Sequence, residues 1–441
     1  MPEIVRDPKL DSTLDVLRQG YTFLYDRSRE YDSDIFQIRL MGMQAICLHG
    51  PEAAQLFYDP EYFIRTGAIP RRVQTTLMGL HAIQTRDNGE HRCRKEMFMS
   101  LMVPESRQRL MSLLAEQWQQ YAQRWEQTEE VVLFRESQEI LCRAACTWAG
   151  VPLQEDEVEL RARDFGAMID GFGGVGPRHW RGKQARIRGE KWMRGIIRDI
   201  RSGKLQPQPG TAAHAVAWHR EPDGELFDVQ MAAIELINAV RPIVAIATYI
   251  AFAAVALHEY PPYRQQLRNP SEDYAELFVQ EVRRYFPFTP FVGAIVRDNF
   301  TWHGFKFPKG TMVLLDVYGT NRDARWWQDP EVFWPDRFRH WQDNAFNFIP
   351  QGGGDFLTGH RCAGEWITIE AMKQAVHFLN EGITYDVPPQ DLRYDLTRMP
   401  TLPASGFVMR NVRVTGKTAP IVTPVASPAP APTGGCPFHH G

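Results

Sequence analysis

The sequence predicts a mainly α-helical protein that also contains small β-sheets, and three observations support this fold class. Between residues 104 and 202, apolar side chains recur at three- and four-residue spacing, which is the period of amphipathic helices. Residues 228–258 form a largely apolar run of helical length. Short segments near residue 40 alternate apolar and polar positions, as half-buried strands do. The 441 residues, 44% of them hydrophobic, can bury a large core, but their number alone allows one large domain or two or three smaller ones.

The first predicted element is a β-hairpin formed by residues 34–40 and 44–48, which turns around Met41-Gly-Met. Amphipathic helices are then predicted over residues 104–125, 135–150, 155–171 and 182–202. The last of these stretches is strongly basic, and we interpret its charges as a solvated helix face. The basic residues are Arg181, Lys183, Arg186, Arg188, Lys191, Arg194, Arg198 and Arg201.

A longer helix is predicted from Asp228 to about His258, with Pro242 near its middle, where a kink is expected. Its longest uncharged apolar-rich run, from Ile243 to Leu257, falls short of the ~20 residues that span a bilayer. We therefore predict a buried core helix. Because the first residues contain no continuous apolar segment, neither a secretory signal nor a membrane anchor is expected.

Charge and cysteine content narrow the classes of function. The formal net charge is -3 and there is no long block of Lys and Arg, so nothing favours a nucleic-acid partner, and a small or apolar substrate is expected. The six cysteines include no C-x-x-C pair and match neither a disulfide scaffold nor a zinc site, which indicates a cytoplasmic protein. Cys47, Cys142 and Cys146 are interpreted as core residues.

The end of the chain differs in composition from the rest. Residues 416–441 are rich in Pro and Ala and lack the apolar periodicity needed to pack. We predict a disordered tail there, after a folded region of residues 1–415. The tail ends in Cys436-Pro-Phe-His-His-Gly, which we interpret as a chance cluster rather than a metal site.

Cys362 is the strongest candidate for a metal ligand. It lies near the end of a glycine-rich segment, residues 348–365, directly before a predicted helix. The unpaired N–H groups of a helix start favour a thiolate, and His360 and Arg361 are expected to add positive potential. Gly364 lets the backbone lie close to a flat cofactor. Cys362 therefore suits the role of an anionic ligand to iron.

Two further motifs precede the cysteine segment. Glu281 and Arg284 share one helix face, and a second arginine, Arg337, lies in Asp-Pro-Glu-Val-Phe-Trp-Pro-Asp-Arg-Phe. A buried carboxylate needs charged partners, so a network of these three residues is expected. In order and spacing these motifs resemble the cytochromes P450. The resemblance implies a single large helical domain with small β-sheets, in which haem b lies between the long helix and the cysteine loop, with Cys362 as its axial thiolate.

The same resemblance implies which side chains hold the haem propionates. His91 and Lys95 are four residues apart, so both can face one way on a helix. Together with His360 and Arg65 they are expected to bind the propionates. For each residue the alternative is an ordinary exposed basic side chain.

The centre of the long helix departs from the wider family. Oxygen-activating members carry an acidic residue followed by threonine, which relay protons; this chain has Arg241 and Pro242 instead. Proline can neither donate nor relay a proton, so the usual dioxygen route is compromised. An arginine in an apolar helix needs an anion. A substrate carboxylate is the preferred partner, and an internal salt bridge to Glu235 is the alternative.

Arg241-Pro242, together with residues 278–288, 347–354, 359–362 and 405–410, resembles the bacterial fatty-acid peroxygenase branch of the family over about residues 10–413. This resemblance implies an enzyme that uses hydrogen peroxide to hydroxylate long-chain fatty acids at the α or β carbon, without a reductase or NAD(P)H. The substrate carboxylate, held by Arg241, is expected to take a proton from peroxide and return it to the departing oxygen.

Gln84 aligns with a position that is glutamine in hydroxylating relatives and histidine in alkene-forming ones, which favours hydroxylation and leaves minor decarboxylation to terminal alkenes open. Two other functions remain as alternatives: a cytochrome P450 monooxygenase supplied by ferredoxin or flavodoxin, and a non-catalytic sensor of haem or fatty acid. The candidate walls of the acyl channel are Ile169, Phe172, Phe288 and Phe291.

Overall fold

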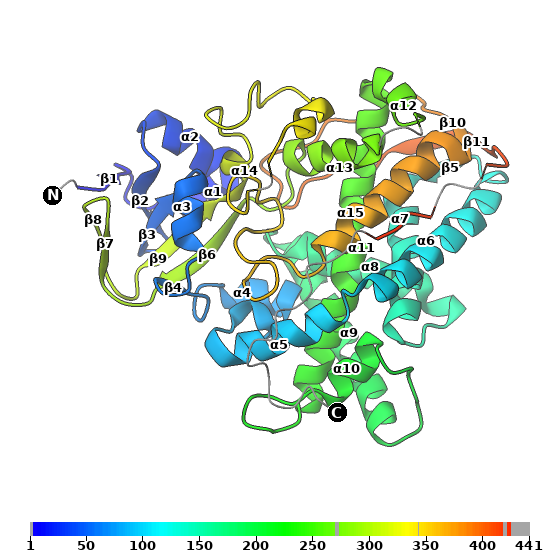
Figure 1. The fold of residues 1–441 in the computed structure, drawn as a ribbon, viewed down its shortest axis with the longest axis horizontal. Coiled ribbons are helices and arrows are strands. Elements are labelled where there is room, and N and C mark those ends of the chain that lie inside the picture. The colour runs from blue at the N-terminus through cyan, green and yellow to red at the C-terminus, as the bar shows by residue number, and fades with distance from the viewer. Residues whose placement is uncertain (1–2, 270–272, 343, 418–420, 425–441) are drawn as a thin grey trace.

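The computed structural model describes residues 3–269, 273–342, 344–417 and 421–424. The fold is mainly helical with small β-sheets, as predicted. A smaller sheet-containing part holds the N-terminus, and a larger helical part surrounds the long helix α11, Val229–Glu259 (Figure 1).

The N-terminal half contains most of the shorter helices. In chain order the helices there are α1 Thr13–Gln19, α2 Thr22–Glu30, α3 Pro51–Phe57, α4 Arg71–Val73, the π-helix η1 Gln74–Met78, the 3-10 helix η2 Ile83–Thr85, α5 Asn88–Ser100, α6 Pro104–Trp125, α7 Leu133–Ala149, the 3-10 helix η3 Glu155–Glu157, α8 Val158–Gly171 and α9 Pro177–Arg201. The later helices are α10 Ala212–Trp218, α11, α12 Pro262–Gln266, α13 Tyr274–Tyr285, α14 Val317–Thr320, the 3-10 helix η4 Pro335–Arg339, α15 Glu365–His377 and the π-helix η5 Phe378–Gly382.

The strands form three sheets in the described part of the chain. The largest has the order β1-β2-β3-β9-β6-β4, the second has the order β10-β11-β5, and β7 pairs with β8. The predicted hairpin is confirmed as β2 and β3, with Leu40 opposite Met43. The strands are β1 Val5–Arg6, β2 Ile35–Leu40, β3 Met43–Leu48, β4 Phe63–Ile64, β5 Glu130–Val132, β6 Phe291–Val296, β7 Phe300–Trp302, β8 Phe305–Phe307, β9 Met312–Asp316, β10 Ile383–Asp386 and β11 Val408–Val414.

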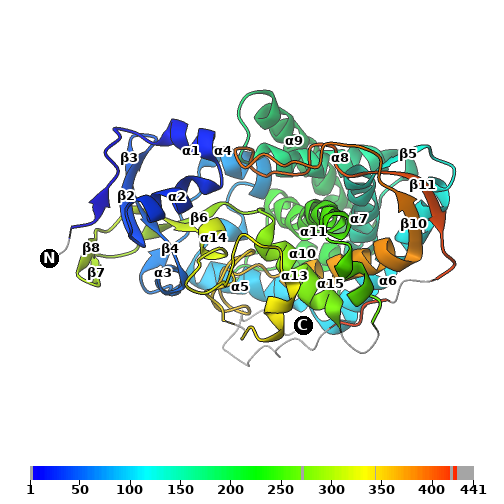
Figure 2. The ribbon, with the colours of Figure 1, turned by 90° about the horizontal axis from the view of Figure 1, so that it is seen from above.

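Helix α11 forms the centre of the main hydrophobic core. It packs against α7, α9 and α15, which lie around it in both views (Figures 1 and 2). Asp228 caps its first turn by accepting hydrogen bonds from the N–H groups of Gln230 and Met231, at 2.7 and 2.9 Å. The helix is long and apolar enough to cross a membrane, but 89% of its most apolar 18-residue window is buried inside the protein. This burial is the one expected of a core helix.

The amphipathic helices lie close to their predicted positions. The prediction for α6 agrees at both ends, where Pro104 occupies the first turn. Helix α9 begins five residues earlier than predicted, also with a proline in its first turn. The solvated-face interpretation of α9 is right for Arg181, Arg188 and Arg198, which are exposed. It is wrong for Arg186, which is only 2% exposed because it turns inward towards α11.

Part of the predicted C-terminal tail is described by the structure. The N–H of Val422 donates a hydrogen bond to the buried Gln374 side chain at 2.9 Å, and Val422 is itself buried. At this point the tail packs against α15, in contrast to the predicted disorder, because a buried side-chain acceptor satisfies its backbone. The Cys436-Pro-Phe-His-His segment lies outside the described residues.

Candidate active site

Cys362 lies two residues before the N-cap of α15, at the end of the glycine-rich loop. Its N–H donates to the carbonyl of Gln351 at 3.1 Å, and the Gln351 amide lies 3.8 Å from the sulfur. A side chain at Gly364 would begin 4.0 Å from that sulfur, so glycine keeps the space beside it open. The loop thus holds a sulfur atom with free space next to it.

The electrostatics of Cys362 differ from the expected excess of positive potential. Arg361 is neutralised by an ion pair with Glu365 at 2.6 Å. Burial and the charge of Glu365 raise the pKa of Cys362 above its ordinary value, and the opposing effects of Lys95 and the Gly364 N–H are smaller. A metal cation bound to the sulfur supplies the positive charge that the thiolate needs.

Arg241 is a buried arginine without a protein partner in the described part of the chain. It is 7% exposed, its Nε has no hydrogen-bond partner, and no ion pair joins it to a carboxylate there. Burial and the nearby Arg186 lower the pKa of Arg241 to about 9, whereas Cys362 acts in the opposite direction. The guanidinium is therefore desolvated and uncompensated, which favours an incoming anion.

The internal salt bridge that was the alternative for Arg241 does not form. Glu235 accepts hydrogen bonds from Ile83 N–H at 2.8 Å, from Arg94 at 3.1 Å and from Asn238 at 3.0 Å. Between Ala232 and Leu257 every residue of α11 is buried except Pro242 and Ala245. These two residues lie beside Arg241 in sequence, so the helix is open to internal space at that level.

A second group of basic side chains gathers beside the cysteine loop. His91 and Lys95 of α5 are buried, and the rings of His91 and His360 are 3.9 Å apart. Lys95 Nζ donates to the Arg361 carbonyl at 2.5 Å, and Arg65 is buried with its Nη1 donating to the Gly293 carbonyl at 2.8 Å. The four predicted residues therefore lie at the surface of one region next to Cys362.

The pKa values of this basic group are uniformly depressed. Burial, followed by the charge of Lys95, lowers the pKa of His91 to about 4, and burial also lowers the pKa of Lys95 to about 8. The pKa of His360 and that of Arg65 are lowered by burial as well. Groups that would hold more charge in water are kept from it here, and an anionic ligand would restore that charge.

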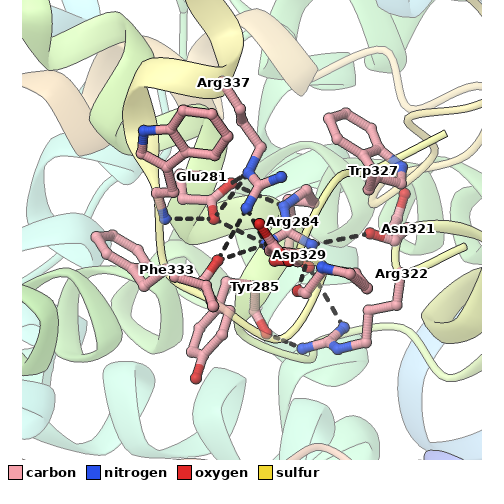
Figure 3. Close-up of polar contacts among 12 residues, drawn as sticks. Glu281, Arg284, Tyr285, Asn321, Arg322, Trp327, Asp329, Phe333 and Arg337 are labelled. Carbon is pink, nitrogen blue, oxygen red and sulfur yellow. Dashed lines mark hydrogen bonds and ion pairs between the residues drawn. The ribbon is translucent and has the colours of Figure 1, made fainter. Parts of the chain in front are cut away.

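Glu281, Arg284 and Arg337 form a buried network, shown in Figure 3. Both oxygens of Glu281 accept from Arg284 at 2.7 Å, and Arg337 Nε lies 3.2 Å from the carboxylate. Arg284 also donates to the carbonyl of Asn321 at 3.2 Å, and the Asn321 side chain accepts from Ile349 N–H at 2.8 Å. The network thus reaches the start of the cysteine loop.

The comparisons with known proteins agree with this arrangement. The sequence pattern of the family described as cytochrome P450 matches residues 271–392. The solved structure of cytochrome P450EX alpha (CYP152N1) with myristic acid is 41% identical, with a TM-score of 0.90, and covers 94% of this chain and 100% of that one. The chain belongs to the cytochrome P450 family. It is an oxidoreductase, and its neighbours belong to the fatty-acid peroxygenase branch named CYP152.

Further relatives of this cytochrome P450 support the same placement. Cytochrome P450SP alpha (CYP152B1) is 46% identical with a TM-score of 0.90, covering 92% of this chain and 100% of that one. Cytochrome P450 OleT in complex with arachidonic acid is 39% identical with a TM-score of 0.91, covering 94% and 99%. A more distant relative, the beta-amyrin 28-monooxygenase of Solanum lycopersicum, is 23% identical over 91% of this chain and 90% of its own length.

As a cytochrome P450, the protein has haem b with a cysteine thiolate ligand, and its residues fit this group. The sulfur of Cys362 and the free space beside Gly364 suit the iron and the flat ring. The four buried basic residues with depressed pKa values suit the two propionate groups. The assignment of propionate ligands is a proposal that follows from this match.

The structure also places the remaining predicted residues of this cytochrome P450. Gln84 lies in η2, and its buried Oε1 lacks a partner among the described residues. Ile169 and Phe172 lie at the end of α8, and the ring of Phe288 stacks on Tyr249 of α11 at 5.1 Å. Phe291 lies on β6 and packs against the cluster formed by residues of β2, β3 and β9. The proposed channel walls thus come from separate elements.

Sequence reasoning missed two residues of the cysteine loop. Gln351 contacts the Cys362 sulfur and also donates to Thr368 at 3.0 Å. Arg283 donates to Gln351 at 3.1 Å and pairs with Glu365, so it links α13 to the loop. The only sequence signal was the Arg-Arg pair that follows Glu281, of which just the second member belonged to a recognised motif.

Proposed function

We propose that this cytochrome P450 uses hydrogen peroxide to hydroxylate long-chain fatty acids at the α or β carbon. The observation that carries the proposal is the buried, unpartnered guanidinium of Arg241, which adjoins Pro242 on the helix facing the cysteine loop. Three relatives support the substrate class, because CYP152N1 binds myristic acid, OleT binds arachidonic acid and CYP152B1 binds (R)-ibuprophen, as their structures are described.

Arg241 binds the substrate carboxylate. A planar guanidinium matches a carboxylate with two parallel hydrogen bonds, and in a buried site such a pair is strong. The cost of desolvating Arg241 has already been met during folding, so the arriving anion gains most of the interaction energy. The binding of a carboxylate beside Arg241 also raises the depressed pKa of this side chain again.

The substrate then performs the proton transfers that this helix cannot. Pro242 has neither a hydroxyl nor an N–H group, so it relays no proton. The bound carboxylate accepts a proton from hydrogen peroxide and returns it to the oxygen that leaves as water. The haem with its Cys362 thiolate supplies cleavage of the O–O bond and transfer of the remaining oxygen atom to carbon. No electron donor is needed, so no redox partner is required.

The position of attack follows from the anchoring of the head group. Because Arg241 fixes the carboxylate, only the first carbons of the chain reach the reacting oxygen. Gln84 offers an amide where alkene-forming relatives have histidine, so hydroxylation is expected to exceed decarboxylation. Ile169, Phe172, Phe288 and Phe291 are proposed to line the path of the acyl chain. The proposed compartment is the cytoplasm.

The test is incubation of the purified holoenzyme with myristic acid and hydrogen peroxide, without reductant, and identification of products by mass spectrometry. Hydroxymyristic acids are expected. Arg241→Ala should lower kcat/KM by about 10²–10³-fold, the size expected when one partner of a buried charged hydrogen-bonded pair is removed. Arg188→Ala is the control, because Arg188 is half exposed and pairs with Asp164 on the surface.

Near-normal peroxide turnover of Arg241→Ala, with full haem content, would contradict the proposed role of Arg241. Turnover only with ferredoxin or flavodoxin and their reductase would identify a monooxygenase instead. Binding of myristic acid without any product under either condition would identify a sensor.

A further inference from the structure

Glu235 is a fully buried carboxylate that the proposed chemistry does not use. It lies on α11 six residues before Arg241 and has 0% exposure. Burial raises the pKa of Glu235, whereas Arg94, Asn238 and the N–H of Ile83 lower it. A buried charge with three designated partners needs an explanation, because well-packed apolar residues would often serve stability as well.

The partners of Glu235 converge on one short segment, residues 77–85, which we call the Gln84 loop. Glu235 itself accepts from Ile83 N–H at 2.8 Å, one residue before Gln84. Arg94, which shares the same carboxylate oxygen at 3.1 Å, donates to the His81 carbonyl at 2.7 Å. Three backbone groups of the loop are thus tied, directly or through one side chain, to Glu235 or to the residues beside it.

The third attachment comes from the next turn of α11. Asn238 donates one hydrogen bond to Glu235 at 3.0 Å and another to the Met78 carbonyl at 2.9 Å. Arg186 of α9 holds the neighbouring Leu77 carbonyl at 2.9 Å. The loop is therefore fixed at both ends to the helix that carries Arg241, and buried polar contacts of this kind define one geometry.

We infer that Glu235 is a positioning residue: through Ile83 and Arg94 it sets the distance between Gln84 and the carboxylate held by Arg241, and thereby selects the carbon that is oxidised. This inference rests on the proposed function. It also explains why Arg241 stays free for substrate, since the nearest carboxylate of its own helix is fully engaged with other donors.

The expected effect concerns regiochemistry more than binding. Loss of the Ile83 contact releases Gln84, whereas Arg241 keeps its place in the helix. A displacement on the order of 1 Å changes reaction rates by up to about 10²-fold, so the ratio of α- to β-hydroxy product should change by about tenfold. The KM for myristic acid should change by less than kcat does, because the head group remains bound.

The main variant is Glu235→Leu, which has similar volume and no acceptor. Glu235→Gln is the conservative variant, because its amide oxygen can still accept from Ile83 N–H, and it should restore most of the native product ratio. Glu221→Gln is the matched control: Glu221 is the other carboxylate on Arg94, at 3.1 Å, and contacts no residue of the Gln84 loop in the described structure. It should keep the native ratio.

A second route covers the case in which Glu235→Leu does not fold. Ile83→Pro removes the N–H donor while leaving Glu235 in place, and Ala82 has the extended backbone, with ψ 163°, that a following proline requires. It should shift the α-to-β ratio in the same direction as Glu235→Leu. The product ratio is read by mass spectrometry, and myristate affinity by equilibrium binding.

The inference is overturned if Glu235→Leu or Ile83→Pro gives the native product ratio and kcat. It is also overturned if Glu221→Gln shifts the ratio as strongly, because the effect would then come from Arg94 or from general stability. The proposed function is judged separately by the wild-type enzyme: absence of any hydroxymyristic acid with peroxide refutes that function, whereas an unchanged ratio in the variants refutes only the role of Glu235.

Discussion

Replacement of Glu281 by glutamine tests the buried network behind the cysteine loop. The carboxylate of Glu281 is completely buried and accepts two hydrogen bonds from Arg284 at 2.7 Å and one from Trp334 N–H at 2.8 Å. Arg337 adds a second guanidinium at 3.2 Å (Figure 3). Glutamine keeps the shape but removes the negative charge, and its NH2 group faces donors. Arg284 then retains only backbone carbonyl partners.

The size of the effect follows from the burial of these groups. Removing one partner of a buried ion pair costs about 3–5 kcal/mol, because an uncompensated charge is left inside. With an unfolding entropy of roughly 2 cal/mol/K per residue, a chain of 441 residues loses about 1 °C in Tm per kcal/mol. Glu281→Gln should therefore lower Tm by about 3–5 °C.

The assay is thermal unfolding of the holoenzyme, combined with measurement of haem content. Haem content should fall as well, since Arg284 and Asn321 connect the network to Ile349 at the start of the cysteine loop. Glu331→Gln is the control, because Glu331 is 63% exposed and 3.8 Å from its arginine; such a surface pair contributes at most about 1 kcal/mol. Equal Tm values for the two variants would refute the reasoning.

Two further predictions concern parts of the fold away from the network. Burial lowers the pKa of His49, but the hydrogen bond and charge of Asp316 outweigh it and the net pKa is raised. The stability from this pair is thus complete below the ordinary histidine pKa and is lost as pH rises through the folded pKa, so His49→Gln should flatten the fall of Tm between about pH 6 and 9; an unchanged slope would contradict this. Gly79→Ala should lower the free energy of unfolding by about 2–4 kcal/mol in urea, because φ is +92° and a methyl group would overlap Arg186. Gly42→Ala, with φ +77° and open space, should lower it by only about 1–2 kcal/mol, and equal losses would refute the packing argument.

The elements that the sequence predicted best are those whose limits are set locally. Pro104 marks the start of α6, and Asp228 caps α11, so periodicity and end signals coincide there. The β2–β3 hairpin follows from alternation around a short turn. The place of β9 between β3 and β6 was not predictable in the same way, because it pairs residues more than 250 positions apart, and no local period records such pairing.

The candidate site was predicted residue by residue, but not its electrostatics. Cys362, His91 and Lys95 carry recognisable motifs, and the structure brings them together. The raised pKa of Cys362 depends on its burial and on Glu365, and the ion pair of Arg361 cancels a charge that the sequence analysis counted as free. Burial and pairing are properties of the assembled fold, so a motif alone supplies the residue without its charge state.

Glu235 and Arg241 illustrate the same difference with opposite signs. A sequence shows one acidic and one basic residue on an apolar helix, and a mutual salt bridge is the simplest interpretation. In the structure the carboxylate is saturated by donors from three directions, and the guanidinium is left without an anion among the described residues. A protein that only needed to neutralise both charges would pair them with each other. Keeping them apart stabilises one loop with the first charge and reserves the second for a ligand, which is why the unsatisfied member of the two identifies the substrate as an acid.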